Sequence, residues 1–454
     1  MDISAIIEKI NGFIWGPPLM VLLVGTGIYL TGRFFFIQFR GFHHAGNVLR
    51  GKYDDPNDPG EISHFQALSA ALSATIGTGN IVGVAAAIAA GGPGAVFWMW
   101  VTALVGMATK FTSCTLAVHF RKIDSEGEAH GGPMHYIEMG MGKNFRWLAV
   151  LFAFFTATAS LGIGNMFQIN NIAVNLNVLT GGSGDSIPFS FRFISGVIIA
   201  VLTGMVILGG IKSIGSFASK IVPFMSVFYV FGGLVILALH FTEIPSAFGK
   251  IFYFAFNKPE ALAGGLLGTV IRFGVARGLF SNEAGLGSAA MAHGAAKTKE
   301  PVREGLVAML GPFIDTIVIC SITALVIIIT GAYEIEGIKD GELTGKAFSL
   351  GLGNSFGATL VAAAVVFFAF STIISWSYYG DRAADYLFGK RAVLPYRFIY
   401  LAFIIIGATI KLDTVLTFSD AMNGLMAAPN LIALIVLSPV VGALIKEYFG
   451  KYRE

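Results

Sequence analysis

The feature that most constrains this chain is a series of long apolar segments along its whole length. A helix needs roughly 20 apolar residues to cross a bilayer. Eleven segments meet that length, near residues 14–33, 64–90, 94–119, 145–177, 190–211, 216–241, 263–295, 304–333, 355–380, 394–411 and 413–444. With 55% hydrophobic and 13% charged residues, the chain leaves no connection long enough for a soluble domain. We therefore predict an all-α integral membrane protein with eleven transmembrane helices in one domain, 1–454.

Lysine and arginine are divided unevenly between alternate connections. One set collects most of the 30 basic residues, whereas the other holds only Lys9, Arg192, Lys250, Lys258, Lys339, Lys346 and Lys411. Connections rich in lysine and arginine stay on the cytoplasmic side. We therefore predict a multi-pass protein of the cell membrane with its N-terminus outside and its C-terminus in the cytoplasm.

The second apolar segment contains a stretch that a helix would avoid. Within Ser63–Gly94, the run Thr75–Asn80 reads TIGTGN. Its two glycines lower helix propensity, and its threonine and asparagine side chains compete for backbone hydrogen bonds. Inside hydrocarbon, broken backbone is tolerated only where protein buries it or where it lines a wet cavity. The run is therefore either a kink between packed helices or the wall of a binding site.

A second interrupted stretch favours the binding site. We expect Phe273–Asn282, followed by Glu283–Ser288, to be broken in the same manner. If 14–33 is an extra helix, the two broken helices open two sets of five spans, over 64–241 and 263–444. Five is odd, so the second set enters the membrane from the opposite side, which gives an inverted repeat. Paired broken helices at matching positions indicate the binding site of a transporter.

The first break offers two kinds of ligand. A new half-helix begins beyond it, and the unpaired N–H groups of Thr78, Gly79 and Asn80 would face an anion such as a carboxylate. The carbonyl groups released before the break, from Ser73 to Gly77, are hard oxygen ligands suited to Na⁺. We therefore expect an anionic group and a sodium ion beside the same break.

Polar side chains in three other spans are candidates for the same site. Asn165 and Gln168 share a helix face, and they either contact substrate or bond to neighbouring helices. Ser371 and Thr372 are adjacent hydroxyls that could complete an oxygen cage for Na⁺, although hydroxyls also bond to their own helix. Asp315 is a carboxylate within a span, where charge is costly, so it is a functional candidate by default.

The second broken helix carries an aromatic residue and three charges. Phe273 stands at its start, where a ring can cover a small ligand or merely pack against lipid or protein. Gly278 permits close approach and irregular backbone. The three charges are Arg272, Arg277 and Glu283. Charges near or within a span indicate a gate or a structural ion pair more than direct substrate contact.

Other classes of function find no support in the sequence. No Walker A motif is present, so ATP drive within the chain is not expected. Ser288 and His293 lie five apart and so on different helix faces, which argues against a hydrolase. The histidines do not cluster as metal ligands, and a net charge of +3 points to no nucleic-acid partner. Cys114 and Cys320 lie inside apolar spans, and no removable signal peptide is expected.

Three blocks of sequence resemble the alanine or glycine:cation symporter family. They are SATIGTGNIVGVA (73–85), GGPGAVFWMWVTALVGM (91–107) and ARGLFSNEAGLGSA (276–289). The resemblance runs from the first span to the last. It implies Na⁺- or H⁺-coupled uptake of alanine or glycine, on the amino-acid–polyamine–cation architecture that is shared with neurotransmitter:sodium symporters. That architecture agrees with the five-plus-five arrangement.

The resemblance also implies a substrate site at the two broken helices. Amide groups of Thr78 and Gly79 would hold the substrate carboxylate, with Asn80 following, and Phe273 would be the aromatic lid. The indole of Trp376 would leave room only for the methyl group of alanine or the hydrogen of glycine. The other residues expected beside the substrate are Thr75, Asn165, Gln168, Ala276 and Gly278.

One sodium site is implied in the same way. Its ligands would be two carbonyl oxygens near the break and two adjacent hydroxyls, from Ser73, Ile76, Ser371 and Thr372. A further sodium site built as in the sodium symporters is not expected, because Gly274 stands where they carry a threonine after the lid phenylalanine. No tyrosine occupies the carboxylate position of the third helix, so Asn165 or Gln168 would replace it.

The function predicted from the sequence is Na⁺-coupled symport of alanine or glycine by alternating access. Ion binding would order the first break and so complete the amide site. Two alternatives remain, an H⁺-coupled symporter with Asp315 or Glu283 as proton acceptor, and an uncoupled channel or facilitator for a small neutral solute. The predicted partners are the amino acid, Na⁺ and the lipid bilayer.

Overall fold

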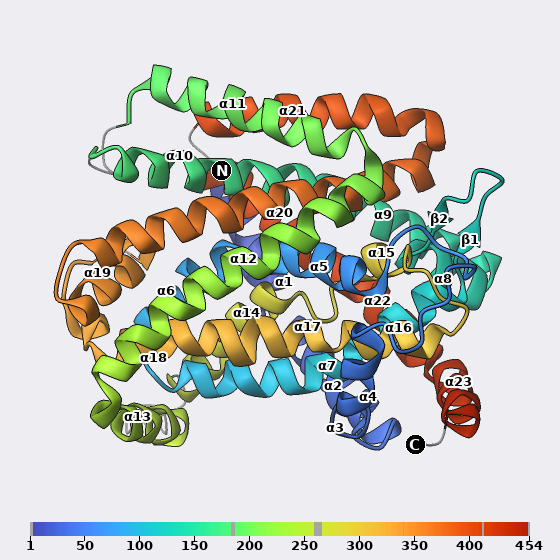
Figure 1. Ribbon diagram of the computed structural model, residues 1–454, viewed down its shortest axis with the longest axis horizontal. Coiled ribbons are helices and arrows are strands. Elements are labelled where there is room, and N and C mark those ends of the chain that lie inside the picture. Colours follow the sequence, from blue (N-terminus) through green and yellow to red (C-terminus); the bar gives the residue numbers. More distant parts are fainter. Residues whose placement is uncertain (1–2, 183–186, 258–265, 339, 411–412, 453–454) are drawn as a thin grey trace.

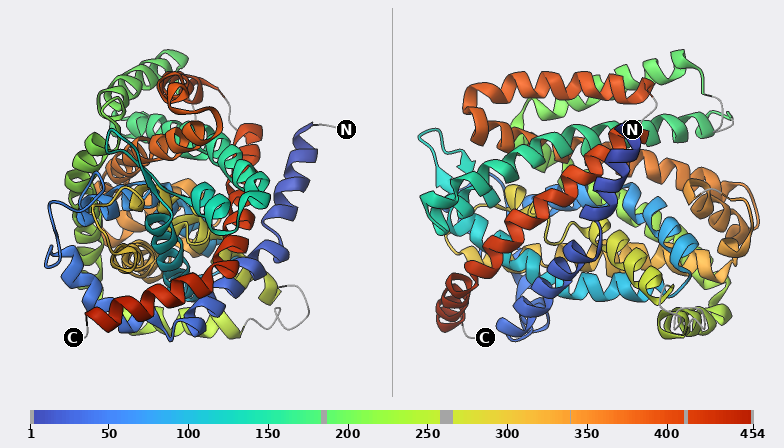
Figure 2. Two further views of the ribbon diagram at one scale, coloured as in Figure 1. Left: turned by 90° about the vertical axis from the view of Figure 1, so that its right-hand side faces the viewer. Right: turned by 180° about the vertical axis from the view of Figure 1, so that it is seen from behind.

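The computed structural model describes residues 3–182, 187–257, 266–338, 340–410 and 413–452 and is almost entirely helical (Figure 1). Most of the long helices run roughly along one axis of the molecule, and Figure 2 shows the same arrangement from two further sides. The exception to helix is an antiparallel hairpin of β1 (Lys122–Ile123) and β2 (Ala129–His130). It lies at one end of the molecule, on the right in Figure 1, and we call that end the hairpin end.

The first half of the chain contributes twelve α-helices, α1 (Ile3–Ile14), α2 (Pro17–Arg33), α3 (Ile37–Arg40), α4 (Phe42–Leu49), α5 (His64–Thr75), α6 (Val82–Gly91), α7 (Ala95–His119), α8 (Pro133–Gly140), α9 (Arg146–Leu161), α10 (Phe167–Leu179), α11 (Phe189–Ile207) and α12 (Gly210–Leu239). The second half contributes α13 (Ile244–Phe256), α14 (Leu266–Asn282), α15 (Ala289–His293), α16 (Pro301–Ala308), α17 (Leu310–Pro312), α18 (Ser321–Ile329), α19 (Asp340–Leu352), α20 (Phe356–Phe388), α21 (Val393–Thr409), α22 (Asp413–Val436) and α23 (Ser438–Lys451). Between them lie 3₁₀ turns, among them η1 (Thr78–Asn80), and two π-helical segments, η3 (Gly162–Met166) and η5 (Phe313–Cys320).

Nine helices of the described residues are long and apolar enough to cross a membrane, or ten if the bent pair α5 and α6 counts as one span. Ten of the eleven predicted spans have such a counterpart. The exception is the predicted span 263–295, because α14 has 17 residues and ends at Asn282, while residues 258–265 lie outside the described part of the chain. The chain is thus a multi-pass membrane protein.

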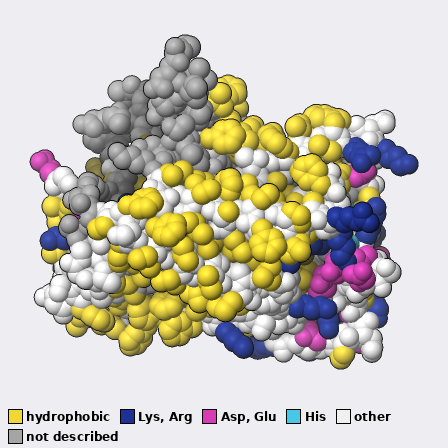
Figure 3. Space-filling view, turned by 90° about the horizontal axis from the view of Figure 1, so that it is seen from above, with side chains coloured by type: hydrophobic (Ala, Val, Ile, Leu, Met, Phe, Trp, Pro, Cys, Tyr) yellow, Lys and Arg dark blue, Asp and Glu magenta, His cyan; other side chains and the backbone are white. Residues whose placement is uncertain are grey.

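The surface fits a protein that is surrounded by lipid. Large apolar side chains are exposed along α11 and α12, among them Phe193, Ile198, Val201, Met205, Phe224, Val227 and Phe231. Figure 3 shows apolar side chains spread over the middle of one face, whereas lysine and arginine gather at the hairpin end. A contiguous exposed apolar surface of this kind is unfavourable in water and favourable in a bilayer.

The two helices predicted to be broken lie in the interior. Helix α5 is buried from Ala67 to Thr75 and packs against α12 and α20, while α14 packs against α6 and α7. Small residues allow the close approach of α14 and α7, since a Cβ at Gly274 would lie 2.7 Å from Cβ of Trp98 and one at Gly278 would lie 3.1 Å from Cα of Met99. The fold therefore places both interrupted segments against each other near the centre of the helical bundle.

Candidate functional site

The first break lies where the sequence predicts it. Helix α5 ends at Thr75, Gly77 is extended, and α6 begins at Val82 after the short turn η1, with a bend of 61° between the two helices. The side chain of Asn80 bridges the break, because its Oδ1 accepts a hydrogen bond from the backbone N–H of Gly77 at 2.9 Å. The unwound segment is therefore held by its own sequence and is not a loosely packed kink.

Two backbone N–H groups remain available at this break. Among the described residues, none accepts a hydrogen bond from the backbone N–H of Thr78 or Gly79. Both residues are buried and line a central pocket. Buried N–H groups without partners at the start of a helical segment form a site for an anionic group.

The second break falls later than the start of the predicted stretch. Helix α14 is continuous through Phe273–Asn282, and the interruption is confined to Glu283–Ser288. Three residues there have positive φ, 54° at Glu283, 95° at Gly285 and 88° at Gly287. A non-glycine residue at positive φ is uncommon and is frequently found at functional sites. The expectation that helix 273–282 is itself interrupted is corrected accordingly.

A central pocket lies between the two breaks. Its lining comes from six helical elements and the breaks, and consists of Ala74, Thr75, Gly77, Thr78, Gly79, Ile163, Gln168, Phe280, Glu283, Thr372, Trp376 and Asn423. It encloses about 30 Å³, which is room for about two water molecules. A ligand as large as an amino acid therefore needs the lining to move outward by a small amount.

Glu283 gives the pocket a carboxylate. Its Oε1 accepts a hydrogen bond from Nε1 of Trp376 at 3.1 Å, and its Oε2 accepts one from Oγ of Ser288 at 2.5 Å. Glu283 is 5% exposed, so its charge is expensive unless hydrogen bonds or a cationic ligand offset it. The carboxylate and the free N–H groups of the first break thus line one pocket with opposite polarity.

Asp315 connects the two breaks behind the pocket. Its Oδ1 accepts from Nδ2 of Asn80 at 2.6 Å, and its Oδ2 accepts from Oγ of Ser281 at 2.8 Å and Oγ1 of Thr316 at 2.7 Å. It lies in the π-helical segment η5, and π-helical insertions are frequent at functional sites. Asp315 therefore fixes the first break relative to the end of α14.

Oxygen atoms gather on the other side of the first break. The carbonyl oxygen of Ser73 accepts from Oγ of Ser371 at 3.3 Å and from Oγ1 of Thr372 at 3.2 Å, and Oγ of Ser73 donates to the carbonyl of Ser371 at 2.8 Å. All three residues are buried. Carbonyl and hydroxyl oxygens are the ligand set that a hard cation prefers, so the cluster fits a sodium ion. Ile76, the other predicted ligand, lies directly before Gly77. Gly77 is close to the cluster, because a Cβ added to it would lie 2.8 Å from Oγ1 of Thr372.

The structure sorts the predicted substrate residues into two groups. Those that line the central pocket are Thr75, Thr78, Gly79, Gln168 and Trp376. The other group points elsewhere: Asn80 bonds to Asp315, Asn165 donates to the carbonyl of Tyr400 at 2.7 Å, and Gly278 packs against α7. Phe273 and Ala276 line a second cavity on the far side of Phe280 from the central pocket.

Several pocket residues were not identified from the sequence as substrate contacts. Phe280 lines the pocket in the place that was expected of Phe273. Phe273 lies on the same face of α14, seven residues or two helical turns before Phe280. The position of Phe280 directly before Ser281 and Asn282 was the available signal. Ala74 and Ile163 lie within stretches that the sequence singled out, but their apolar side chains carry no chemical signal of their own. Asn423 lies in an apolar span without a neighbouring motif.

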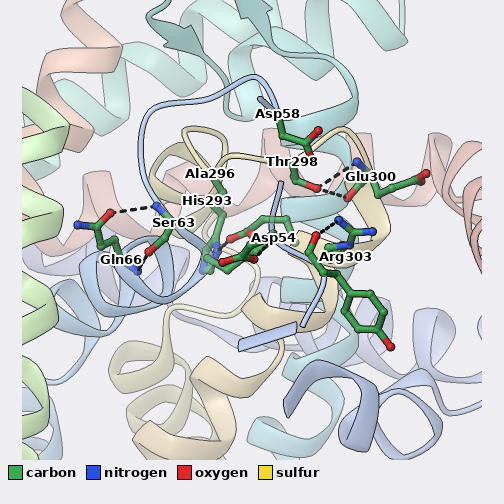
Figure 4. Close-up of polar contacts among 12 residues, drawn as sticks. Asp54, Asp58, Ser63, Gln66, His293, Ala296, Thr298, Glu300 and Arg303 are labelled. Atoms are coloured by element: carbon green, nitrogen blue, oxygen red, sulfur yellow. Dashed lines mark hydrogen bonds and ion pairs between the residues drawn. The ribbon is translucent and has the colours of Figure 1, made fainter. Parts of the chain in front are cut away.

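The two broken helices are also joined at the hairpin end. The carboxylate of Glu304 is hydrogen-bonded by Nδ1 of both His64, the first residue of α5, and His293, the last residue of α15. A backbone bridge pairs Ile62 with Ala296. Figure 4 shows this region, where His293, Ala296 and the capping pair Ser63 and Gln66 lie close together. We call this group the hairpin-end junction, and it closes one end of both helices.

Comparison with known proteins places this chain among transporters. The sequence model of the sodium:alanine symporter family matches residues 1–454. A sodium/alanine symporter, AgcS of Methanococcus maripaludis, is 47% identical over 456 residues, which cover 99% of this chain and 98% of the relative. An uncharacterized transporter of Haemophilus influenzae is 47% identical over 458 residues, which cover 100% of this chain and 98% of the relative. A crystal structure of a manganese transporter mutant of Eremococcus coleocola shares the fold alone, with a TM-score of 0.50 and 14% identity over 85% of this chain and 81% of that one. The chain belongs to the sodium:alanine symporter family.

Proposed function

We propose that this protein couples Na⁺ influx to the uptake of alanine or glycine across the cell membrane by alternating access. One observation carries the proposal: the unpaired N–H groups of Thr78 and Gly79 and the hydroxyl pair Ser371 and Thr372 adjoin the same break. A single unwound segment therefore serves the substrate and the ion.

The pocket suggests how an amino acid lies. The carboxylate accepts hydrogen bonds from the N–H groups of Thr78 and Gly79, where the half-helix presents its positive end. The ammonium group faces the carboxylate of Glu283, and the side chain lies beside Trp376 and Ile163. Because the indole and Phe280 take up most of the space, a methyl group or a hydrogen is favoured over a larger side chain.

The ion acts through the backbone of the break. Sodium held by the Ser73 carbonyl and the hydroxyls of Ser371 and Thr372 fixes the chain just before Gly77. The N–H groups that hold the carboxylate follow within two residues, so ion and substrate each favour the ordered break. Two ligands that stabilise the same conformation bind cooperatively and reciprocally.

The remaining parts of the proposal concern the whole chain. An extra helix precedes two inverted sets of five spans, and the N-terminus lies outside with the C-terminus in the cytoplasm. The hairpin end, which is rich in lysine and arginine, then faces the cytoplasm. Release into the cell requires the hairpin-end junction to part, because it closes that end of both broken helices.

The decisive measurement is alanine binding to the purified protein by calorimetry, in Na⁺ and then with choline in its place. We expect alanine to bind more tightly in Na⁺. In Thr372→Ala, the Na⁺ concentration needed for this tightening should rise about tenfold or more, as expected for one lost charge-assisted contact. Thr372→Ser keeps the hydroxyl and is the matched control. Binding that ignores Na⁺ in the unaltered protein would contradict the proposal.

Coupling to H⁺ is the second candidate. The observation that favours it is the carboxylate of Glu283 inside the central pocket, next to the position proposed for the ammonium group. In that case alanine binding would change with pH and not with Na⁺, and Glu283→Gln would abolish the pH response. The same calorimetric titration at several pH values separates the two candidates.

A further inference from the structure

A second cavity lies next to the central pocket, between α1, α14 and α22. Five residues of α14 line it, and all but Arg272 recur at helical spacing: Phe273, Ala276, Arg277 and Phe280. Such a stripe normally packs against another helix, yet here it borders a space of about 140 Å³, against about 30 Å³ for the central pocket. Phe280 lines both cavities, so its side chain forms part of the wall between them.

Charges of both signs line this second cavity. Arg272 and Arg277 come from α14 and Asp420 comes from α22. Oδ2 of Asp420 accepts a hydrogen bond from Nδ2 of Asn11 at 3.1 Å, and its backbone carbonyl accepts one from Nε1 of Trp15 at 3.1 Å. These bonds hold the aspartate at the cavity wall.

Arg277 is attracted by the carboxylate of Asp420 across the cavity but makes no direct contact with it. Its guanidinium carbon lies 5.9 Å from the centre of the Phe280 ring, and neither a hydrogen bond nor an ion pair joins it to a described residue. A half-buried arginine beside a membrane span is costly without a partner, and such residues mark substrate pathways. The cavity thus offers a cation and an anchored carboxylate that attract each other without direct contact, beside an aromatic wall.

We propose that the second cavity binds the zwitterion of an α-amino acid before it reaches the central pocket. Arg277 receives the carboxylate, because a guanidinium matches its two oxygens, and Asp420 receives the ammonium group. Displacement of the Phe280 side chain then opens the way to the central pocket. The inference rests on the proposed function, because it takes the transported amino acid as the ligand.

The charge pattern predicts selectivity at this stage. A simple carboxylate would satisfy Arg277 and leave Asp420 without a cation, whereas a simple amine would do the reverse. Either leaves a charged group unpaired in a partly desolvated site, which lowers affinity. The second cavity therefore selects zwitterions, while the tight central pocket selects for size.

The test uses thiol accessibility in the full-length protein. Ala276→Cys places a thiol in the second cavity and not in the central pocket, and the natural Cys114 and Cys320 are buried. A positively charged methanethiosulfonate reagent is applied in Na⁺ buffer, with and without alanine or glycine. A second set of measurements adds Thr78→Val, which removes from the central pocket the hydroxyl that donates to Oε1 of Gln168 at 3.4 Å.

We expect either amino acid to slow modification of the introduced cysteine several-fold in both backgrounds. Arg277→Gln, or independently Asp420→Asn, raises the concentration needed for protection by about ten- to a hundredfold. Arg192→Gln, an arginine outside the cavity, is the matched control and leaves protection unchanged. Propionate and ethylamine, each with one of the two charges, do not protect.

Protection that survives Arg277→Gln and Asp420→Asn, or modification that alanine and glycine leave unchanged, would overturn the inference. Protection by propionate or ethylamine alone would overturn the zwitterion assignment. Failure of the proposed function gives a different result, in which the unaltered protein shows no Na⁺-driven uptake of alanine although the amino acid still protects the cysteine.

Discussion

At the scale of single residues, Trp376 sets the size of the central pocket. Its indole lines the pocket and is oriented by the hydrogen bond to Glu283, and Gly164 packs against its ring. We expect Trp376→Ala to admit larger amino acids, because the removed indole leaves space beside the substrate side chain. Competition of methionine and leucine against labelled alanine uptake measures the change.

Gly164→Ala is the converse variant. Its added Cβ would lie 2.5 Å from both Cβ and Cγ of Trp376, so the tryptophan must shift from its present position against the pocket. We therefore expect weaker alanine binding and a relative preference for glycine. A Trp376→Ala protein that still excludes methionine, with Gly164→Ala unchanged in affinity, would show that the indole does not limit substrate size.

Residues at the first break could be predicted from the sequence better than those at the second. TIGTGN is anomalous for a membrane helix, so Thr78 and Gly79 were predicted from their local chemistry, and Thr75 was added by the family resemblance. At the second break the glycines of α14 suggested an interruption within 273–282, but they serve close packing on α7. The distinguishing feature, positive φ at Glu283, is a property of tertiary structure that residue type does not encode.

At the scale of elements, the first break depends on a glycine for the space that it leaves. Gly77 has φ of −139°, which any residue adopts, but an added Cβ would lie 2.8 Å from Oγ1 of Thr372. We expect Gly77→Ala to crowd the proposed sodium ligands and to lower Na⁺ affinity about tenfold or more, since one charge-assisted contact is worth about 1.5–3 kcal/mol. Sodium dependence of alanine binding measures the effect.

A matched control for this variant lies six residues further on. A Cβ at Gly83 in α6 meets no atom within 4 Å, so Gly83→Ala adds helix propensity without a clash. Its sodium affinity should equal that of the unaltered protein. If Gly77→Ala also kept the sodium affinity of the unaltered protein, the sodium ion would not bind on this side of the break.

The hairpin-end junction is the second element whose role can be tested. Glu304 is fully buried and accepts from both His64 and His293. Neither Nε2 atom has a hydrogen-bond partner among the described residues, although Nε2 of His64 lies 3.9 Å from Oδ1 of Asp54. Glu304→Ala leaves two buried imidazoles without their acceptor, at a cost of about 1–3 kcal/mol for each unpaired group. We expect faster hydrogen exchange at Ile62 and Lys297, because their N–H groups donate across the junction and the cost favours parting of the two helices.

A control for this variant lies four residues earlier. Glu300 is labelled with the junction in Figure 4, but its side chain is half-buried and pairs with the exposed Lys451 at 3.5 Å. Solvent-accessible ion pairs contribute about 0–1 kcal/mol, so Glu300→Ala should leave exchange at Ile62 and Lys297 unchanged. If exchange in Glu304→Ala were as slow as in the unaltered protein, the backbone bridge alone would hold the junction.

At the scale of the whole molecule, hydropathy predicted most of the helical layout, because each span must satisfy its backbone internally and so needs a long apolar run. Ten predicted spans have a counterpart of that kind. The internal connections were less predictable. Ile62 pairs with Ala296 and His64 with Glu304, so both contacts join residues more than 200 positions apart in the sequence. No local pattern signals such contacts.

Orientation in the membrane is the prediction that belongs to the whole chain. Ser125 in the β-hairpin connection and Ser355 before α20 are both exposed, and α19 and α20 meet at the end of the molecule opposite the hairpin end (Figure 1). Serine to cysteine changes little in size, and the natural Cys114 and Cys320 are buried, so each variant carries one reactive thiol.

In intact cells, a membrane-impermeant maleimide should label Ser355→Cys but label Ser125→Cys only after the membrane is permeabilised. The reason is electrostatic, since lysine and arginine gather at the hairpin end and such connections are retained in the cytoplasm. Labelling in the reverse order would show that the protein has the opposite orientation in the membrane. The hairpin-end junction would then close the outer side of the substrate path.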